Sequence, residues 1–177
     1  MALELPALSA IIARLANPEI NLAAYGGVVF PLALMIESPI IMLLAASTAL
    51  SKDWASYRKL NRFMMVTSAA LTLLHIAVAF TPLYYFVVVK LIGAPAEIIE
   101  PARIGLKIMT PWTWSIANRR FNQGLMIRFG QGWAVTAGTF IRLGADITVL
   151  LIGYSMKTVP GIVVATSAVA AGVVSES

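Results

Sequence analysis

Residues 22–49 read LAAYGGVVFPLALMIESPIIMLLAASTA and contain one side chain that is charged at neutral pH, Glu37. A helix needs about 20 mostly apolar residues to cross the roughly 30 Å hydrocarbon core of a bilayer. The stretch is longer than this, so it predicts a transmembrane helix. Four further apolar stretches, the second of them more polar than the rest, predict spans over residues 63–89, 103–127, 131–153 and 158–174.

The composition of the whole chain agrees with a membrane protein. Of the 177 residues, 59% are hydrophobic and 12% are charged, whereas soluble domains carry about 25% charged residues. The shorter apolar segment over residues 3–15 predicts the C-terminal half of a first helix. We therefore expect an all-α, polytopic membrane helix bundle. It would form a single transmembrane domain over residues 1–177, with about five full transmembrane helices and a partial first one.

Several functional classes are disfavoured by residue content. The chain has no cysteine, which excludes disulfides and thiolate metal sites. One histidine and no acidic cluster argue against a catalytic zinc ion, and no nucleophile is paired with a base. The net charge of +5 comes from basic residues between apolar stretches, not from one basic face, which disfavours nucleic-acid binding. We expect no enzyme, no cofactor and no metal.

The basic residues predict an orientation in the membrane. Cytoplasmic loops of membrane proteins carry an excess of lysine and arginine. A cytoplasmic connection over residues 51–62 collects most of these cations on that side. We therefore expect a multi-pass protein of the inner or plasma membrane with a cytoplasmic C-terminus. The residues expected on the cytoplasmic side are Lys52, Arg58, Lys59, Arg62, Arg119, Arg120 and Arg128.

Four polar residues near the middle of predicted spans are candidate site residues: Glu37, His75, Arg142 and Asp146. A charged group at bilayer depth costs about 2.5–3.5 kcal/mol on insertion scales, so each needs a partner or a function. Transporter sites are usually built near the midplane, and we expect these residues to line a central cleft. Glu37 or Asp146 would be the protonatable group.

Each candidate also has a purely structural interpretation. Arg142 and Asp146 are four residues apart on one helical face and could simply neutralise each other. His75 fits an interhelical hydrogen bond better than a proton relay. Glu37 has no cation within a helical turn, so its partner must come from another helix or from a water-filled cavity.

Arg119 and Arg120 lie at the polar end of the 103–127 segment, where two interpretations remain open. The arginines could snorkel toward the membrane surface and anchor a helix end. Alternatively, together with Arg142, they could form a basic mouth that attracts anionic substrates or lipid head groups.

The order of these features resembles that of the multidrug and toxic compound extrusion (MATE) transporters. The run PEINLAAYG, residues 18–26, resembles the family's first loop, where an external turn enters a second helix beginning Leu-Ala-Ala. KLIGAP, residues 90–95, with Glu97 to Leu106 resembles the connection into helix four. The family often has a proline where this chain has Pro111. It often has a basic residue and a glycine before helix five, where this chain has Arg128-Phe129-Gly130. The resemblance covers nearly the whole chain but includes no sharp motif.

The resemblance implies a transporter lobe. Family members have about twelve helices in two related six-helix lobes, so this chain would be an incomplete N-terminal lobe that lacks the second one. Many members carry a cation-binding acid on helix one and another on helix six. Here Glu4 matches the first position only loosely, and the last helix has no acid before Glu176. The wider MOP flippase superfamily includes lipid-linked oligosaccharide flippases and progressive-ankylosis-type exporters of small anions, which the helix-four arginines resemble at least as much.

The leading hypothesis is therefore a MATE-like secondary transporter or efflux protein that works by alternating access. Its substrate would be a small organic ion or drug-like molecule, and Arg119, Arg120 and Arg142 would favour anions. Its coupling ion would be a proton or sodium. The alternatives are a flippase for a lipid-linked substrate, or a non-transporting truncated fragment or accessory membrane subunit.

Overall fold

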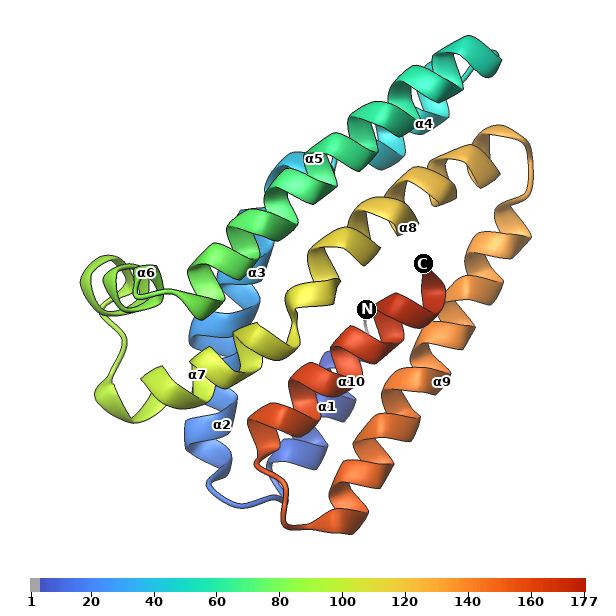
Figure 1. Cartoon of the computed structure of the whole chain (residues 1–177). Coiled ribbons are helices and arrows are strands. Elements are labelled where there is room, and N and C mark those ends of the chain that lie inside the picture. The colour runs from blue at the N-terminus through green and yellow to red at the C-terminus, as the bar shows by residue number, and fades with distance from the viewer. Residues whose placement is uncertain (1–3) are drawn as a thin grey trace.

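The computed structural model describes residues 4–177, and this range is all-α (Figure 1). The expected helix over 3–15 is α1, and residue 3 lies outside the described residues. Successive long segments run up and down, so that the α4–α5 and α8–α9 turns lie at one end and the α1–α2 and α9–α10 turns at the other (Figure 1). The elements are α1 (Glu4–Ile12), α2 (Pro18–Ala24), η1 (Tyr25–Val29), α3 (Phe30–Glu37), η2 (Ser38–Ile40), α4 (Leu43–Leu50), α5 (Trp54–Phe80), α6 (Leu83–Tyr85), η3 (Phe86–Ile92), α7 (Ala96–Ile108), α8 (Thr110–Arg128), α9 (Gly132–Met156) and α10 (Gly161–Glu176).

Among residues 4–177, three helical stretches are long and apolar enough to cross a membrane: Pro18–Leu50, Trp54–Phe80 and Gly132–Met156. They correspond to the segments predicted over 22–49, 63–89 and 131–153, and they indicate a membrane protein. Large apolar side chains point outward from all three, as expected for surfaces that contact lipid tails. Met35, Leu73 and Phe140, for example, are 70%, 65% and 69% exposed.

The first span, Pro18–Leu50, is one helical stretch that contains two prolines, Pro31 and Pro39. At each of them the helix changes its geometry over a few residues. A proline ring collides with the carbonyl four residues earlier, and for Pro31 the turn at that place widens into the π-helical segment η1. Pro39 cannot donate to the carbonyl of Met35. The hydroxyl of Ser38 donates to that oxygen instead, at 2.9 Å. The helical stretch therefore continues past both prolines.

The second predicted span, 63–89, was wrong at both ends. Its helix, α5, begins at Trp54, because Asp53 caps it: the carboxylate accepts a hydrogen bond from the backbone N–H of Ser56 at 2.7 Å. The same bond holds the pKa of Asp53 below its ordinary value. The helix ends at Phe80, because Pro82 cannot continue it. Residues 83–92 then form a separate short helix, which consists of α6 and the π-helical segment η3.

The third predicted span, 103–127, was also wrong as a single helix. The structure divides it into α7 and α8, with the break at Met109, two residues before Pro111. Pro111 has no N–H to bond the carbonyl of Lys107 and fits the first turn of a helix, so α7 ends and α8 begins just before it. The fifth predicted span, 158–174, is the 16-residue helix α10.

Helix α10 lies at the centre of the fold, where it contacts α1, α2, α7, α8 and α9. Its composition explains this position, since its alanine and glycine residues let neighbouring backbones approach closely. Gly153 of α9 leaves room for Val164, and Gly105 of α7 leaves room for Ile162. These small residues bring the polar side chains of α8, α9 and α10 into one buried region.

Candidate functional site

A buried network of charged side chains joins four helices near the C-terminal end of α10. Arg142 of α9 pairs with Glu4 of α1 at 2.5 Å, and Arg119 of α8 pairs with Glu176 of α10 at 2.9 Å. Arg142 is also 3.9 Å from Glu176, which links the two pairs. Asp146 of α9 lies beside Arg142. We call these five residues, whose side chains are 4% to 11% exposed, the ion network.

Asp146 differs from the other members because its carboxylate oxygens have no hydrogen-bond donor. Both oxygens are buried, and among residues 4–177 neither finds a hydrogen-bond partner. The nearest cationic atom, Nε of Arg142, is 3.8 Å away and therefore beyond hydrogen-bonding distance. Gly172 of α10 makes this position possible, because a Cβ atom there would collide with the carboxylate.

The charges of the ion network do not balance when every member is ionised. Three carboxylates, those of Glu4, Asp146 and Glu176, face the two guanidinium groups of Arg119 and Arg142. A buried carboxylate that receives no hydrogen bond is costly, and the ion pair with Arg142 at 3.8 Å offsets this cost only in part. One added proton removes the excess negative charge, and Asp146, whose buried carboxylate lies close to that of Glu4 and receives no N–H bond from residues 4–177, can accept it.

Glu37 lies outside the ion network and has the interhelical partner that its sequence context required. The indole N–H of Trp112, on α8, donates to Oε2 of Glu37 at 2.6 Å. Both side chains are buried, with Glu37 4% exposed and Trp112 1% exposed. This bond ties the first span to α8.

His75 forms a hydrogen bond with Thr113, the residue of α8 that follows Trp112. Its Nδ1 lies 3.0 Å from the hydroxyl of Thr113, and its Nε2 lies 2.9 Å from the carbonyl oxygen of Leu106. Because a carbonyl can only accept, Nε2 carries the proton and Nδ1 accepts from Thr113. The ring is fully buried and both nitrogens are used, which fits the structural interpretation, a bond between helices.

The two neighbouring arginines in the middle of α8 have different environments. Arg119 is 6% exposed and paired with Glu176, so the prediction of a snorkelling anchor is wrong for this residue. Arg120 is half-buried, and in the described part of the chain its Nε has no hydrogen-bond partner. The structure thus divides the sequence candidates: Arg119, Arg142 and Asp146 share the ion network, whereas Glu37 and His75 each bind α8 separately.

Sequence reasoning missed four residues that the structure places in these contacts, one of which is Thr113, the partner of His75. Glu4 and Glu176 complete the ion network, although both lie near the ends of the chain and outside the predicted spans. Trp112 holds Glu37. One signal was present: Trp112 stood inside a predicted span rather than at a membrane interface, where tryptophan is usually found.

A cleft of about 170 Å³ borders the ion network between α8 and α9. Arg119, Gln123 and Glu176 form its polar wall, and Trp133 and Ile141 contribute to its apolar wall. Gln123 donates its amide to Glu176 at 2.9 Å. The cleft therefore gives the Arg119–Glu176 pair a route to the surface at the end where the α8–α9 turn lies.

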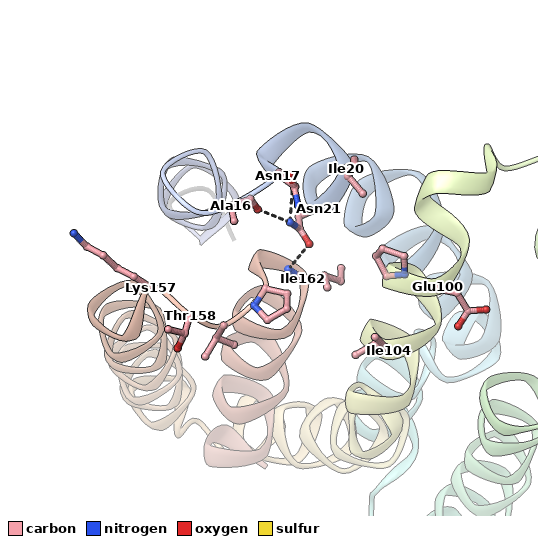
Figure 2. A pocket seen from close by; sticks show the side chains of 12 residues that line it. Ala16, Asn17, Ile20, Asn21, Glu100, Ile104, Lys157, Thr158 and Ile162 are labelled. Carbon is pink, nitrogen blue, oxygen red and sulfur yellow. Dashed lines mark hydrogen bonds between the residues drawn. The ribbon is translucent and has the colours of Figure 1, made fainter.

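A second pocket, of about 360 Å³, lies at the opposite end between α2, α7 and the start of α10. Figure 2 shows Asn21 in its wall, with its amide donating to the carbonyls of Ala16 and Asn17, both at 2.9 Å, and accepting from the N–H of Ile162 at 3.0 Å. These three bonds go to backbone groups of the protein itself. The Asn21 amide is therefore a structural part of the pocket wall and not a group that binds a ligand. Glu100, at its edge, accepts from the hydroxyl of Tyr85 at 2.7 Å.

Replacing Trp112 by phenylalanine should destabilise the protein by about 1–2 kcal/mol, because the buried Glu37 carboxylate loses its donor. Thermal unfolding in detergent measures the effect. Trp114→Phe is the matched control, since Trp114 is 36% exposed and lies two residues further along α8. Equal stabilities for the two variants would show that the Glu37–Trp112 bond contributes nothing.

No three His, Cys, Asp or Glu side chains within residues 4–177 are placed to hold a metal ion. Comparisons with known proteins add no assignment: no family model, no curated protein and no solved structure matches this chain. The resemblance to MATE transporters therefore stays a prediction.

Proposed function

We propose that this chain forms one lobe of a MATE-like secondary transporter of the inner or plasma membrane, which moves a small organic ion or drug-like molecule by alternating access and couples this movement to a proton. The observation that carries the proposal is Asp146, a buried carboxylate with two unpartnered oxygens inside a network that holds one negative charge too many. Ionisable groups at membrane depth usually mark ion pathways or proton relays.

The ion network can link protonation of Asp146 to movement of helices. When Asp146 is neutral, Arg142 pairs with Glu4 and Arg119 pairs with Glu176, so every charge has a partner. When Asp146 loses its proton, it competes with Glu4 and Glu176 for the two guanidinium groups. Because these acids lie on α1, α9 and α10, a change of partners favours a different packing of the three helices.

The first span, which is not part of the ion network, has irregular helical geometry of its own. Its π-helical segment η1 and its 3₁₀ segment η2 lie on either side of α3. Such segments within a membrane helix are frequent at functional sites and hinges. Tyr25, Gly26 and Gly27 occupy the first of them.

The preference for substrate charge rests mainly on Arg120. Arg119 and Arg142 are each paired with an acid, so their charges are compensated within the protein. Arg120 is half-buried and lacks such a pair among the described residues, which leaves one guanidinium group to attract an anionic substrate.

Asp146→Asn should abolish transport driven by a pH gradient, with a loss of at least about tenfold, because the amide cannot exchange a proton. The measurement is uptake into proteoliposomes containing the full-length protein, with a panel of cationic drugs and small organic anions. Glu19→Gln, which makes the same change at an exposed acid, should transport normally. Full proton-driven transport by Asp146→Asn would remove Asp146 from the coupling site. Absence of proton-driven transport by the unmodified protein across the panel would contradict the proposed function itself.

A further inference from the structure

An apolar pocket of about 390 Å³ opens where the α4–α5 turn meets the end of α8. Its size falls in the range of about 300–1,000 Å³ that is usual for ligand sites. We call it the aromatic pocket, because three of its six lining residues are aromatic. The lining residues are Ser51, Asp53, Trp54, Tyr57, Leu125 and Phe129.

The walls of the aromatic pocket are rigid on one side and accessible on the other. Trp54 and Tyr57 stack with ring centroids 5.0 Å apart, and Tyr57 in turn packs against Phe121 at 5.7 Å. Trp54 and Phe129, in contrast, are 68% and 67% exposed. Tryptophan and other aromatic rings gather at the level of lipid head groups, so this exposure places the pocket at a membrane interface.

One polar group within the aromatic pocket is left without a partner. Ser51 is 2% exposed, and in the range from residue 4 to residue 177 its hydroxyl has no hydrogen-bond partner. A buried hydroxyl without a partner costs free energy. Because this hydroxyl is itself covered, the accessible walls of the pocket are almost wholly apolar.

Positive charge surrounds the same pocket. Lys52 lies between two lining residues, and Arg58 lies one helical turn after Trp54 on the same face of α5; both are exposed. Arg128 is fixed beside Phe129, because its Nη1 donates to the carbonyl oxygens of Thr48 at 2.7 Å and of Ala49 at 3.2 Å.

The acidic charge near the pocket is small. Within residues 51–62, four cations face a single acid, Asp53. The carboxylate of Asp53 already caps α5 through the N–H of Ser56. The rim therefore keeps a net positive charge that an anionic group can neutralise.

We propose that the aromatic pocket binds one anionic phospholipid from the adjacent leaflet. An acyl chain would lie against Trp54, Leu125 and Phe129, and the phosphate and the anionic head group would lie between Lys52 and Arg58. Basic pockets at the end of membrane helices bind such head groups, and each cation near the surface contributes roughly fivefold in affinity. This inference requires only that the chain lies in a membrane, and it holds whether or not the chain transports.

Lipid titration of the detergent-solubilised full chain, followed by native mass spectrometry, tests the inference. Phosphatidylglycerol and phosphatidylcholine with identical acyl chains serve as probes. The unmodified protein should retain phosphatidylglycerol about twenty-five-fold more tightly, from about fivefold for each of two cations. Lys52→Gln combined with Arg58→Gln should reduce this ratio to near one. Lys90→Gln combined with Lys157→Gln removes two exposed cations outside the pocket and should leave the ratio unchanged.

A second measurement locates the bound lipid. Brominated phosphatidylglycerol quenches tryptophan fluorescence only at close range, so the titration should quench a component that Trp54→Phe removes. Phe129→Ala, at an exposed wall residue, should weaken both lipids alike, because it removes apolar contact and no charge. Equal retention of the two lipids by the unmodified protein would overturn the proposal. A phosphatidylglycerol preference that survives the Lys52 and Arg58 substitutions would also overturn it. So would quenching whose extent is unchanged by Trp54→Phe, since the exposed Trp133 and Trp114 account for the quenching that remains.

Discussion

Arg142→Met should destabilise the protein by about 3–5 kcal/mol, the usual cost of breaking a buried ion pair by removing one partner. Arg142 contacts all three acids of the ion network: Glu4 at 2.5 Å, Asp146 at 3.8 Å and Glu176 at 3.9 Å. Without it, Arg119 alone faces three buried carboxylates. Methionine keeps much of the side-chain volume, so the loss would be one of charge rather than of packing.

Chemical unfolding of the protein in mixed detergent micelles measures this effect. Arg14→Met is the matched control, because Arg14 is exposed and, among residues 4–177, its guanidinium donates only to the carbonyl of Ala10. Combining Arg142→Met with Glu4→Gln should restore part of the stability, since one unpaired carboxylate is removed. Lowering the pH should also restore stability to Arg142→Met, because protonation neutralises the remaining acids. A loss below about 1 kcal/mol would show that the ion network is not maintained by Arg142.

Gly124→Ala should destabilise the protein by up to about 3 kcal/mol, because it forces α8 away from α4. A Cβ atom at Gly124 would overlap the hydroxyl of Ser47 and the backbone carbonyl of Leu44. A carbonyl within a helix cannot rotate away as a side chain can. The separation would also stretch the bond from the hydroxyl of Thr48 to the carbonyl of Gly124, which is 3.1 Å long.

Gly144→Ala provides the control, because a Cβ atom there meets no atom within 4 Å. Since alanine favours a helix over glycine by about 1 kcal/mol, this variant should be as stable as the unmodified protein or slightly more stable. Thermal unfolding of both variants under identical detergent conditions gives the comparison. A Gly124→Ala protein as stable as Gly144→Ala would show that α4 and α8 do not approach as closely as described.

The membrane character of the chain could be predicted from sequence because it depends on composition within a window of about 20 residues. Residues 22–49 and 131–153 were identified for this reason, and both correspond to helices that could span a bilayer. Helix ends were harder to predict. The polar residues 54–62 are helical because Asp53 supplies a cap, a feature that hydropathy does not register.

The positions of prolines were visible in the sequence, but their effects depended on what surrounds each one. Pro31 and Pro39 leave the first span continuous, because a π-helical turn and the hydroxyl of Ser38 compensate for them. Pro82 and Pro111, in contrast, lie at places where a helix ends. A missing hydrogen bond can be replaced only when another donor is near, and the three-dimensional arrangement decides this.

The sequence by itself determined an all-α membrane protein and showed that Glu37, His75, Arg142 and Asp146 needed explanation. Only the tertiary structure decided which side chains meet them. It brought Glu4 and Glu176, from opposite ends of the chain, to Arg142 and Arg119, and it gave Glu37 the indole of Trp112. Hydropathy and helical periodicity are local properties of the chain. The partner of a buried charge depends instead on which helices pack together, and close packing through Gly124, Gly153 and Gly172 fixes that arrangement.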